Sequence, residues 1–116
     1  MKRFRNHMLG VEQGDLLLFS DFEDDGPMWS GSGDCEHRTS VTFSETFRSE
    51  PAVTAWFTLW DIANNDTARL DIVVEHVTKA GFDIVVKTWG DTKVARARAG
   101  WQAIGEARHA DEWDLY

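Results

Sequence analysis

Residues 81–92 read Gly-Phe-Asp-Ile-Val-Val-Lys-Thr-Trp-Gly-Asp-Thr. A glycine turn opens this stretch, and apolar and polar side chains then alternate, which is the period-two pattern of a β-strand with two different faces. Trp89 follows at the point where the strand gives way to a polar turn. An aromatic side chain at a strand exit is well placed to contact a ligand.

The same alternation recurs along the chain. We expect strands over residues 15–20, 38–43, 52–60, 69–77, 82–87 and 94–103. Helix is a rival in the last of these because alanine and arginine are strong helix formers, but the alternation persists throughout it. Six short strands with no amphipathic helix between them predict one all-β domain over residues 1–116, a six-stranded antiparallel β-sandwich. Its core spans about 14–105, and residues 106–116 form an acidic tail in which Trp113 and Tyr116 either dock or stay loose.

The strand at 52–60 carries bulk on both faces. Val53, Ala55, Phe57 and Leu59 share one face, and the other still holds Trp56 and Trp60. We therefore expect a neighbouring subunit to cover the second face.

Residues 21–37 differ in kind, being acidic and rich in glycine. We interpret them as a long loop that folds back onto the body through Phe22, Met28 and Trp29, and long loops in compact domains are usually functional. The acidic side chains could offer oxygens to calcium, but the Asp-x-Asp-x-Asp-Gly loop with its distal glutamate is missing.

Composition excludes several classes of protein. The chain has 12 basic and 20 acidic residues, a net charge of −8, which argues against a nucleic-acid binder but suits a neutral ligand such as a sugar. Cys35 is the only cysteine, so no intrachain disulfide can form; it is a free thiol or a link between subunits. No apolar run matches a Sec-type signal or a membrane span, so we expect a soluble protein, cytoplasmic or exported by a non-classical route.

Enzyme chemistry has little support. The histidines form no His-Glu-x-x-His pair and Cys35 has no second cysteine, so a zinc site lacks its spacing, and no cofactor is indicated. Ser30 stands where the Gly-x-Ser-x-Gly elbow needs its first glycine. A pair of glycosidase carboxylates can always be found among this many acidic residues, so that signal has no specificity. We expect a protein that is not an enzyme.

Three side chains beside the turns are candidates for ligand binding. Arg69 could grip adjacent hydroxyls with its planar fork of donors, or pair with Asp66 or Asp71 as an ordinary surface arginine. Trp89 is a stacking platform or a capping core aromatic, and Asp34, behind a glycine-rich segment, is a hydroxyl acceptor or a solvated carboxylate.

Two arginines alternate on one face of the last strand. Arg96 and Arg98 could meet Glu75 and Asp83 in ion pairs where subunits join, or lie on a solvated face.

From about Gly14 to Gly105 the chain resembles the H-type lectin domain of snail agglutinins and of the C-terminal half of discoidins. The resemblance rests on an ordered set of pieces: Val41-Thr42-Phe43-Ser44 with Phe47, Pro51-Ala52-Val53, Asp61, Arg69, Val77-Thr78 with Gly81-Phe82, Thr88-Trp89 with Asp91-Thr92-Lys93-Val94, and Trp101. It implies a six-stranded β-sandwich assembled as a homotrimer, sometimes doubled to a homohexamer, with a sugar site at the seam between protomers.

Position by position, the resemblance also implies site residues. The arginine that holds N-acetylgalactosamine hydroxyls corresponds to Arg69, the tryptophan near the acetyl group to Trp89, and the residue after it, often histidine, to Gly90. For the family's Gly-x-Asp acceptor the best candidate is Asp34, with Ser32 or Gly33 as its backbone partner.

Two departures from the family affect the site. Ala95 stands where snail agglutinins have a tyrosine, so a stacking contact is lost, and the disulfide cysteines of those lectins are absent.

The resemblance as a whole implies a multivalent lectin for galactose-like or N-acetylgalactosamine-like sugars, with a role such as cell adhesion. The alternative is a structural or adhesive oligomer, part of a larger assembly, that keeps the fold without sugar binding.

Overall fold

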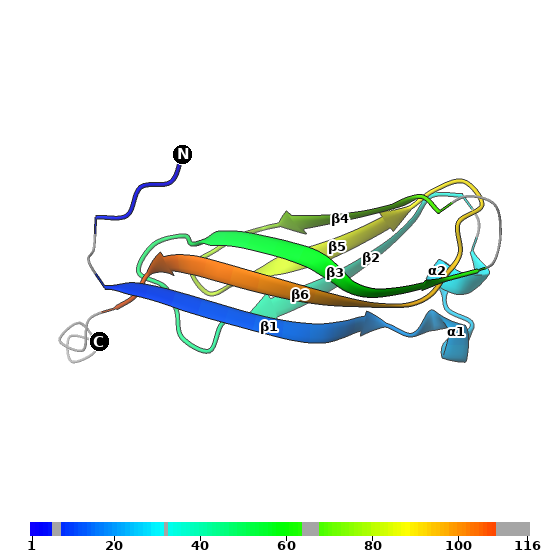
Figure 1. Cartoon of the computed structure of the whole chain (residues 1–116), viewed down its shortest axis with the longest axis horizontal. Helices are drawn as coiled ribbons and strands as arrows, with labels where there is room; N and C mark the ends of the chain where they lie inside the picture. Colours follow the sequence, from blue (N-terminus) through cyan, green and yellow to red (C-terminus); the bar gives the residue numbers. More distant parts are fainter. Residues whose placement is uncertain (6–7, 32, 64–67, 109–116) are drawn as a thin grey trace.

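Two three-stranded antiparallel sheets stack face to face in the computed structural model, which describes residues 1–5, 8–31, 33–63 and 68–108 (Figure 1). Sheet A has the order β1-β6-β3, and sheet B has the order β2-β5-β4. The strands are β1 Leu9–Phe19, β2 Cys35–Thr42, β3 Ala52–Ile62, β4 Leu70–Glu75, β5 Gly81–Thr88 and β6 Val94–Glu106. The predicted six-stranded antiparallel sandwich is confirmed.

The last strand is the centre of sheet A. β6 pairs with β1 on one side and with β3 on the other, so the helix that its alanines could have formed is excluded. Ala97, Ala99 and Ala103 point into the core with none of their surface exposed. Small side chains here leave room for the large rings that enter from the opposite sheet.

The first strand begins at Leu9, earlier than the expected start at Asp15. In this extra length the inward positions are occupied by Gly10, Glu12 and Gly14, whereas Leu9 and Val11 point outward and are more than half exposed. The hydrophobic pattern is therefore inverted, which hid the strand from a search for apolar alternation.

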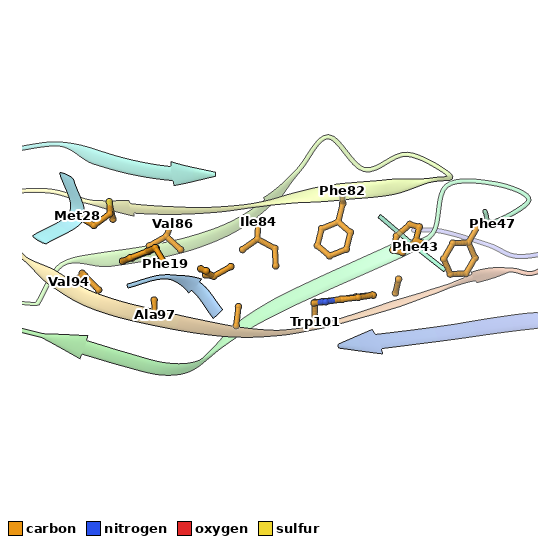
Figure 2. Packing of buried hydrophobic residues seen from close by; sticks show 13 residues of the cluster. Phe19, Met28, Phe43, Phe47, Phe82, Ile84, Val86, Val94, Ala97 and Trp101 are labelled. Atoms are coloured by element: carbon orange, nitrogen blue, oxygen red, sulfur yellow. The ribbon is translucent and has the colours of Figure 1, made fainter. Parts of the chain in front are cut away.

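Aromatic rings fill one end of the core, and mainly aliphatic side chains fill the other (Figure 2). Phe82 lies between Phe43 and Trp101, with ring centroids 5.6 and 5.3 Å away, and Phe47 meets Phe43 edge-on at 5.0 Å. Met28, Phe19, Val86 and Val94 fill the other end. The two-layer core thus extends along the whole length of the sheets.

Residues 21–30 are not an extended loop, contrary to expectation. They form two short helices, α1 Asp21–Asp24 and α2 Pro27–Ser30, at one end of the sandwich (Figure 1). The Asp21 carboxylate accepts a hydrogen bond from the Met28 backbone N–H at 2.9 Å, which ties the two helices together. Met28 is the buried anchor, at 1% exposed, whereas Phe22 is exposed and contacts only the edge of Trp29 among the described rings.

The partners predicted for Arg96 and Arg98 of the last strand are wrong. Arg98 pairs with Asp15 on β1 at 3.1 Å, and Arg96 pairs with Asp61 on β3 at 3.2 Å, both within sheet A. Glu75 and Asp83 belong to sheet B, where Arg38 spans the central strand and contacts both carboxylates, at 2.7 and 3.0 Å. Separation into two sheets is a tertiary fact that alternation along one strand does not contain.

The outer face of sheet A carries the bulk expected at residues 52–60. Trp56 is 46% exposed on this face, while Val53, Ala55 and Phe57 pack against the core. The expectation that Trp60 shares the face of Trp56 is wrong, because a β-bulge between Phe57 and Leu59 reverses the alternation. Trp60 therefore pairs with the core-facing Ala97 and contacts the ring of Phe57, with 57% of its surface exposed. Trp56 lies across Gly100 of β6, where a Cβ would fall 2.7 Å from its Nε1. A single chain therefore leaves two large indoles partly in water.

Candidate functional site

Three strands of sheet B terminate together at the end where α2 lies (Figure 1). Cys35 of β2 and Leu70 of β4 both pair with Thr88 of β5, so the residues just beyond this row are Asp34, Trp89 and Arg69. All three are exposed, Trp89 by 40%. The three candidate side chains, far apart in the sequence, are thus brought to one end of one sheet.

Two glycines in left-handed conformations connect the loops at this end. Gly33 has φ +74° and Gly90 has φ +71°, a region that side chains with a Cβ rarely adopt. The Gly33 backbone N–H donates a hydrogen bond to the Gly90 carbonyl oxygen at 3.2 Å. This bond places the segment that carries Asp34 beside the turn that carries Trp89. Ser32, the other proposed backbone partner, lies outside the described residues.

Arg69 is held at its backbone, and its guanidinium is available. Its backbone N–H donates to the Oγ1 of Thr92, which is 4% exposed, at 2.9 Å. Its Cδ lies 3.6 Å from the position that a Cβ on Gly90 would occupy. Within the described ranges the guanidinium has no ion pair, so the alternative pair with Asp71 does not form; Asp66, the other alternative, lies outside those ranges.

A pocket of about 560 Å³ opens beside Trp89 on the outer face of sheet B. Its lining consists of Asp34, Cys35, Glu36, Asp71, Lys87, Thr88 and Trp89. Glu36 and Asp71 are the direct neighbours of Lys87 across the two ladders of the central strand. Trp89 therefore lines a surface pocket. The alternative interpretation, in which Trp89 caps the core, is wrong.

The row of charged side chains formed by Glu36, Lys87 and Asp71 was not predicted from the sequence. The signal was available, because alternation places Lys87 on the face opposite Val86 and Thr88. It could not be used without the register, which alone decides that these three side chains share a row.

An ion-pair network lies next to the pocket on the same sheet face. The hydrogen bond from Arg38 holds the pKa of Glu75 below its usual value, and those from Ser40 and then Arg38 lower the pKa of Asp83. The Lys87 Nζ lies 3.8 Å from Glu75 Oε2, so the ammonium is drawn along the sheet toward this network.

The family departure at residue 95 is visible in the structure. Ala95 is 5% exposed and offers no surface for stacking.

Among the described residues, no group of three or more His, Cys, Asp or Glu side chains is arranged to hold a metal ion. In that same part of the chain, no helix has the length and apolar character to cross a membrane.

Comparison with known proteins agrees with the fold. The model of the H-type lectin domain matches residues 38–104. The chain is 50% identical to a Fuscovulum blasticum protein named ATP synthase subunits region ORF 7, over 92% of this chain and 93% of that protein.

Two solved structures are also similar to this chain. Native recombinant discoidin II of Dictyostelium discoideum superposes with a TM-score of 0.76 at 23% identity, covering 93% of this chain and 40% of the discoidin chain. Wild-type discoidin II from the same organism gives a TM-score of 0.76 at 23% identity, with 91% and 39% covered. The chain thus spans well under half the length of these discoidins, and at this identity the likeness concerns the fold. Taken with the match over residues 38–104, it means that the chain belongs to the H-type lectin domain family.

Proposed function

We propose that this protein is a multivalent lectin that binds galactose-like or N-acetylgalactosamine-like sugars through Asp34, Trp89 and Arg69. Membership of the family supports carbohydrate binding in general. The observation that carries the proposal is that a guanidinium without an ion pair among the described residues and a 40% exposed indole lie side by side at the end of sheet B. The protein acts in this proposal by binding and not by catalysis.

Each side chain has a chemical task in this proposal. Arg69 donates hydrogen bonds from a planar fork to adjacent hydroxyls. The indole of Trp89 offers a flat apolar surface to the C–H groups of the sugar ring. Asp34 accepts hydrogen bonds from hydroxyls. Gly33 and Gly90 have no side chains, which lets the sugar approach the backbone closely.

We further propose that copies of the chain associate as a trimer or hexamer through the outer face of sheet A. Trp56 is exposed there in the single chain, and buried aromatic residues are typical of subunit interfaces. Association would present several weak sites together and raise the overall avidity by about 10²–10⁴-fold. A sugar site at the seam between protomers then requires a head-to-tail arrangement, in which the outer face of sheet A of one protomer meets the Trp89 end of the next.

A glycan array followed by calorimetry tests the sugar site. Arg69→Ala and Trp89→Ala are each expected to weaken binding at least tenfold, because each removes a group assigned to the sugar. Lys79→Ala, an exposed cation in the turn before β5, is the matched control and should bind as the native chain does. An array on which the folded native protein finds no glycan would contradict the proposal.

A second candidate function is a structural module that keeps the fold without binding sugar. The buried Ala95 favours it, because the aromatic contact of the snail agglutinins has no substitute at that position. Native mass that reports an oligomer, together with an array without hits, would select this candidate.

A further inference from the structure

The pocket beside Trp89 is lined by two of the three side chains assigned to the sugar, Asp34 and Trp89, and extends away from Arg69, which is not part of its lining. Its volume of about 560 Å³ is within the range of ligand pockets, about 300–1,000 Å³. Asp34 and Trp89 line its upper part, and Glu36, Lys87 and Asp71 form the next row down the sheet face. A sugar held on Trp89 would therefore direct its attached residue toward this second row.

The second row is negatively charged and incompletely neutralised. Neither the Glu36 nor the Asp71 carboxylate has a hydrogen bond or an ion pair in the part of the chain that the structure describes. Lys87 stands between them, but its ammonium is directed to Glu75, at 3.8 Å. Since neighbouring strands lie about 4.8 Å apart, the two carboxylates rise on either side of a gap about 10 Å wide at the backbone.

We propose that this pocket is a second sugar subsite and that Glu36 and Asp71 determine its specificity by excluding acidic sugar residues. The proposal rests on the proposed function, since the first sugar must occupy the Trp89 end. The hydroxyls of a neutral residue can donate hydrogen bonds to both carboxylates. The carboxylate or sulfate of an acidic residue would instead face two unpaired negative charges.

The size of the discrimination follows from Coulomb's law. Two like charges about 6 Å apart in the dielectric of water repel enough to weaken binding about threefold. Two such carboxylates therefore give about tenfold, because the Lys87 ammonium between them belongs to a network with Arg38, Glu75 and Asp83 whose four charges sum to zero. The pocket is open to solvent, so salt at about 1 M, with a screening length of about 3 Å, should abolish most of this difference.

Two matched disaccharides test the subsite. The methyl glycosides of N-acetylgalactosaminyl-β1,4-glucose and N-acetylgalactosaminyl-β1,4-glucuronic acid differ only in the hydroxymethyl or carboxylate at C6 of the second residue. Calorimetry at low ionic strength with the full chain should give about tenfold weaker binding of the acid. At about 1 M salt the two affinities should agree within about twofold.

Variants assign the effect to the two side chains. In the double variant Glu36→Gln, Asp71→Asn, the acid should gain about tenfold relative to the neutral disaccharide, while methyl N-acetylgalactosaminide binds as before. Glu45→Gln removes an exposed carboxylate at the other end of the molecule and should leave the ratio of affinities unchanged. Circular dichroism checks that each variant is folded.

The outcomes separate this inference from the proposed function. The selection against acidic sugars would be overturned if the two disaccharides bound the native protein equally, or if the double variant left the ratio of their affinities unchanged. In both cases the proposed function would stand as long as neutral sugars still bound in a way that depends on Arg69. Loss of binding to all three glycosides would contradict the sugar site itself and the subsite with it.

Discussion

Gly14 is the position where the packing makes the sharpest prediction. Its inward face lies directly under Trp101, which is 6% exposed and packed against Phe82 and Phe43. A Cβ on Gly14 would fall 2.8 Å from Nε1 and 3.0 Å from Cε2 and Cζ2 of that indole. The ring cannot move away, because two phenylalanine rings hold its other side, so Gly14→Ala must shift the backbone or the aromatic cluster.

The expected cost is a difference between two effects. Overpacking a closed core costs about 1–3 kcal/mol. Replacing glycine by alanine in a strand returns about 0.5–1 kcal/mol by restricting the unfolded chain. The net loss of folding free energy for Gly14→Ala is therefore about 1 kcal/mol, within a range of about 0–2.5 kcal/mol, or a fall of several degrees in Tm for a domain of this size.

Gly10→Ala is the control on the same strand and the same face. Its Cβ would meet Ala107 at 3.4 Å and Phe47 at 3.5 Å, which are tolerable contacts, so this variant should be neutral or slightly more stable. Urea denaturation followed by circular dichroism, at one protein concentration, measures both variants. Equal free energies of unfolding for the two variants would refute the argument that Trp101 occupies the space above Gly14.

Two further predictions concern the charged network and the subunit interface. In Arg38→Gln the stability difference from the native protein should be full above about pH 5 and should vanish only once the pH falls below the lowered folded-state pKa values of Glu75 and Asp83. Arg38 lowers the pKa of Glu75 and, after Ser40, that of Asp83, and this stabilisation is lost as the two carboxylates are protonated; a difference that persists once both are protonated, measured by urea denaturation, would contradict it. Trp56→Ser should weaken the proposed oligomer by at least about 30-fold in native mass measurements, because it removes the exposed tryptophan of the outer face of sheet A. Phe22→Ser, which removes an exposed ring on α1, should leave the oligomer unchanged; a native protein that is already monomeric would refute the interface.

Much of the fold could be predicted because strand alternation survives in the residues themselves. The segments around Phe57, Ile84 and Trp101 each show the period-two pattern, and each is a strand in the structure. The prediction failed where inward positions are not apolar, as at Glu12 in β1, and where a side chain joins two helices, as Asp21 does through the Met28 amide. Local pattern carries no information about contacts of that kind.

The candidate site divides in the same way. The residue types and their order around Arg69, Trp89 and Asp34 are properties of the sequence, and they were sufficient to name a family and a candidate ligand. That these side chains meet at one end of sheet B, with Glu36 and Asp71 beneath them, depends on the register between β2, β5 and β4. Only the folded chain could decide this, because a shift of one residue in either ladder would turn the side chains of the shifted strand to the opposite face.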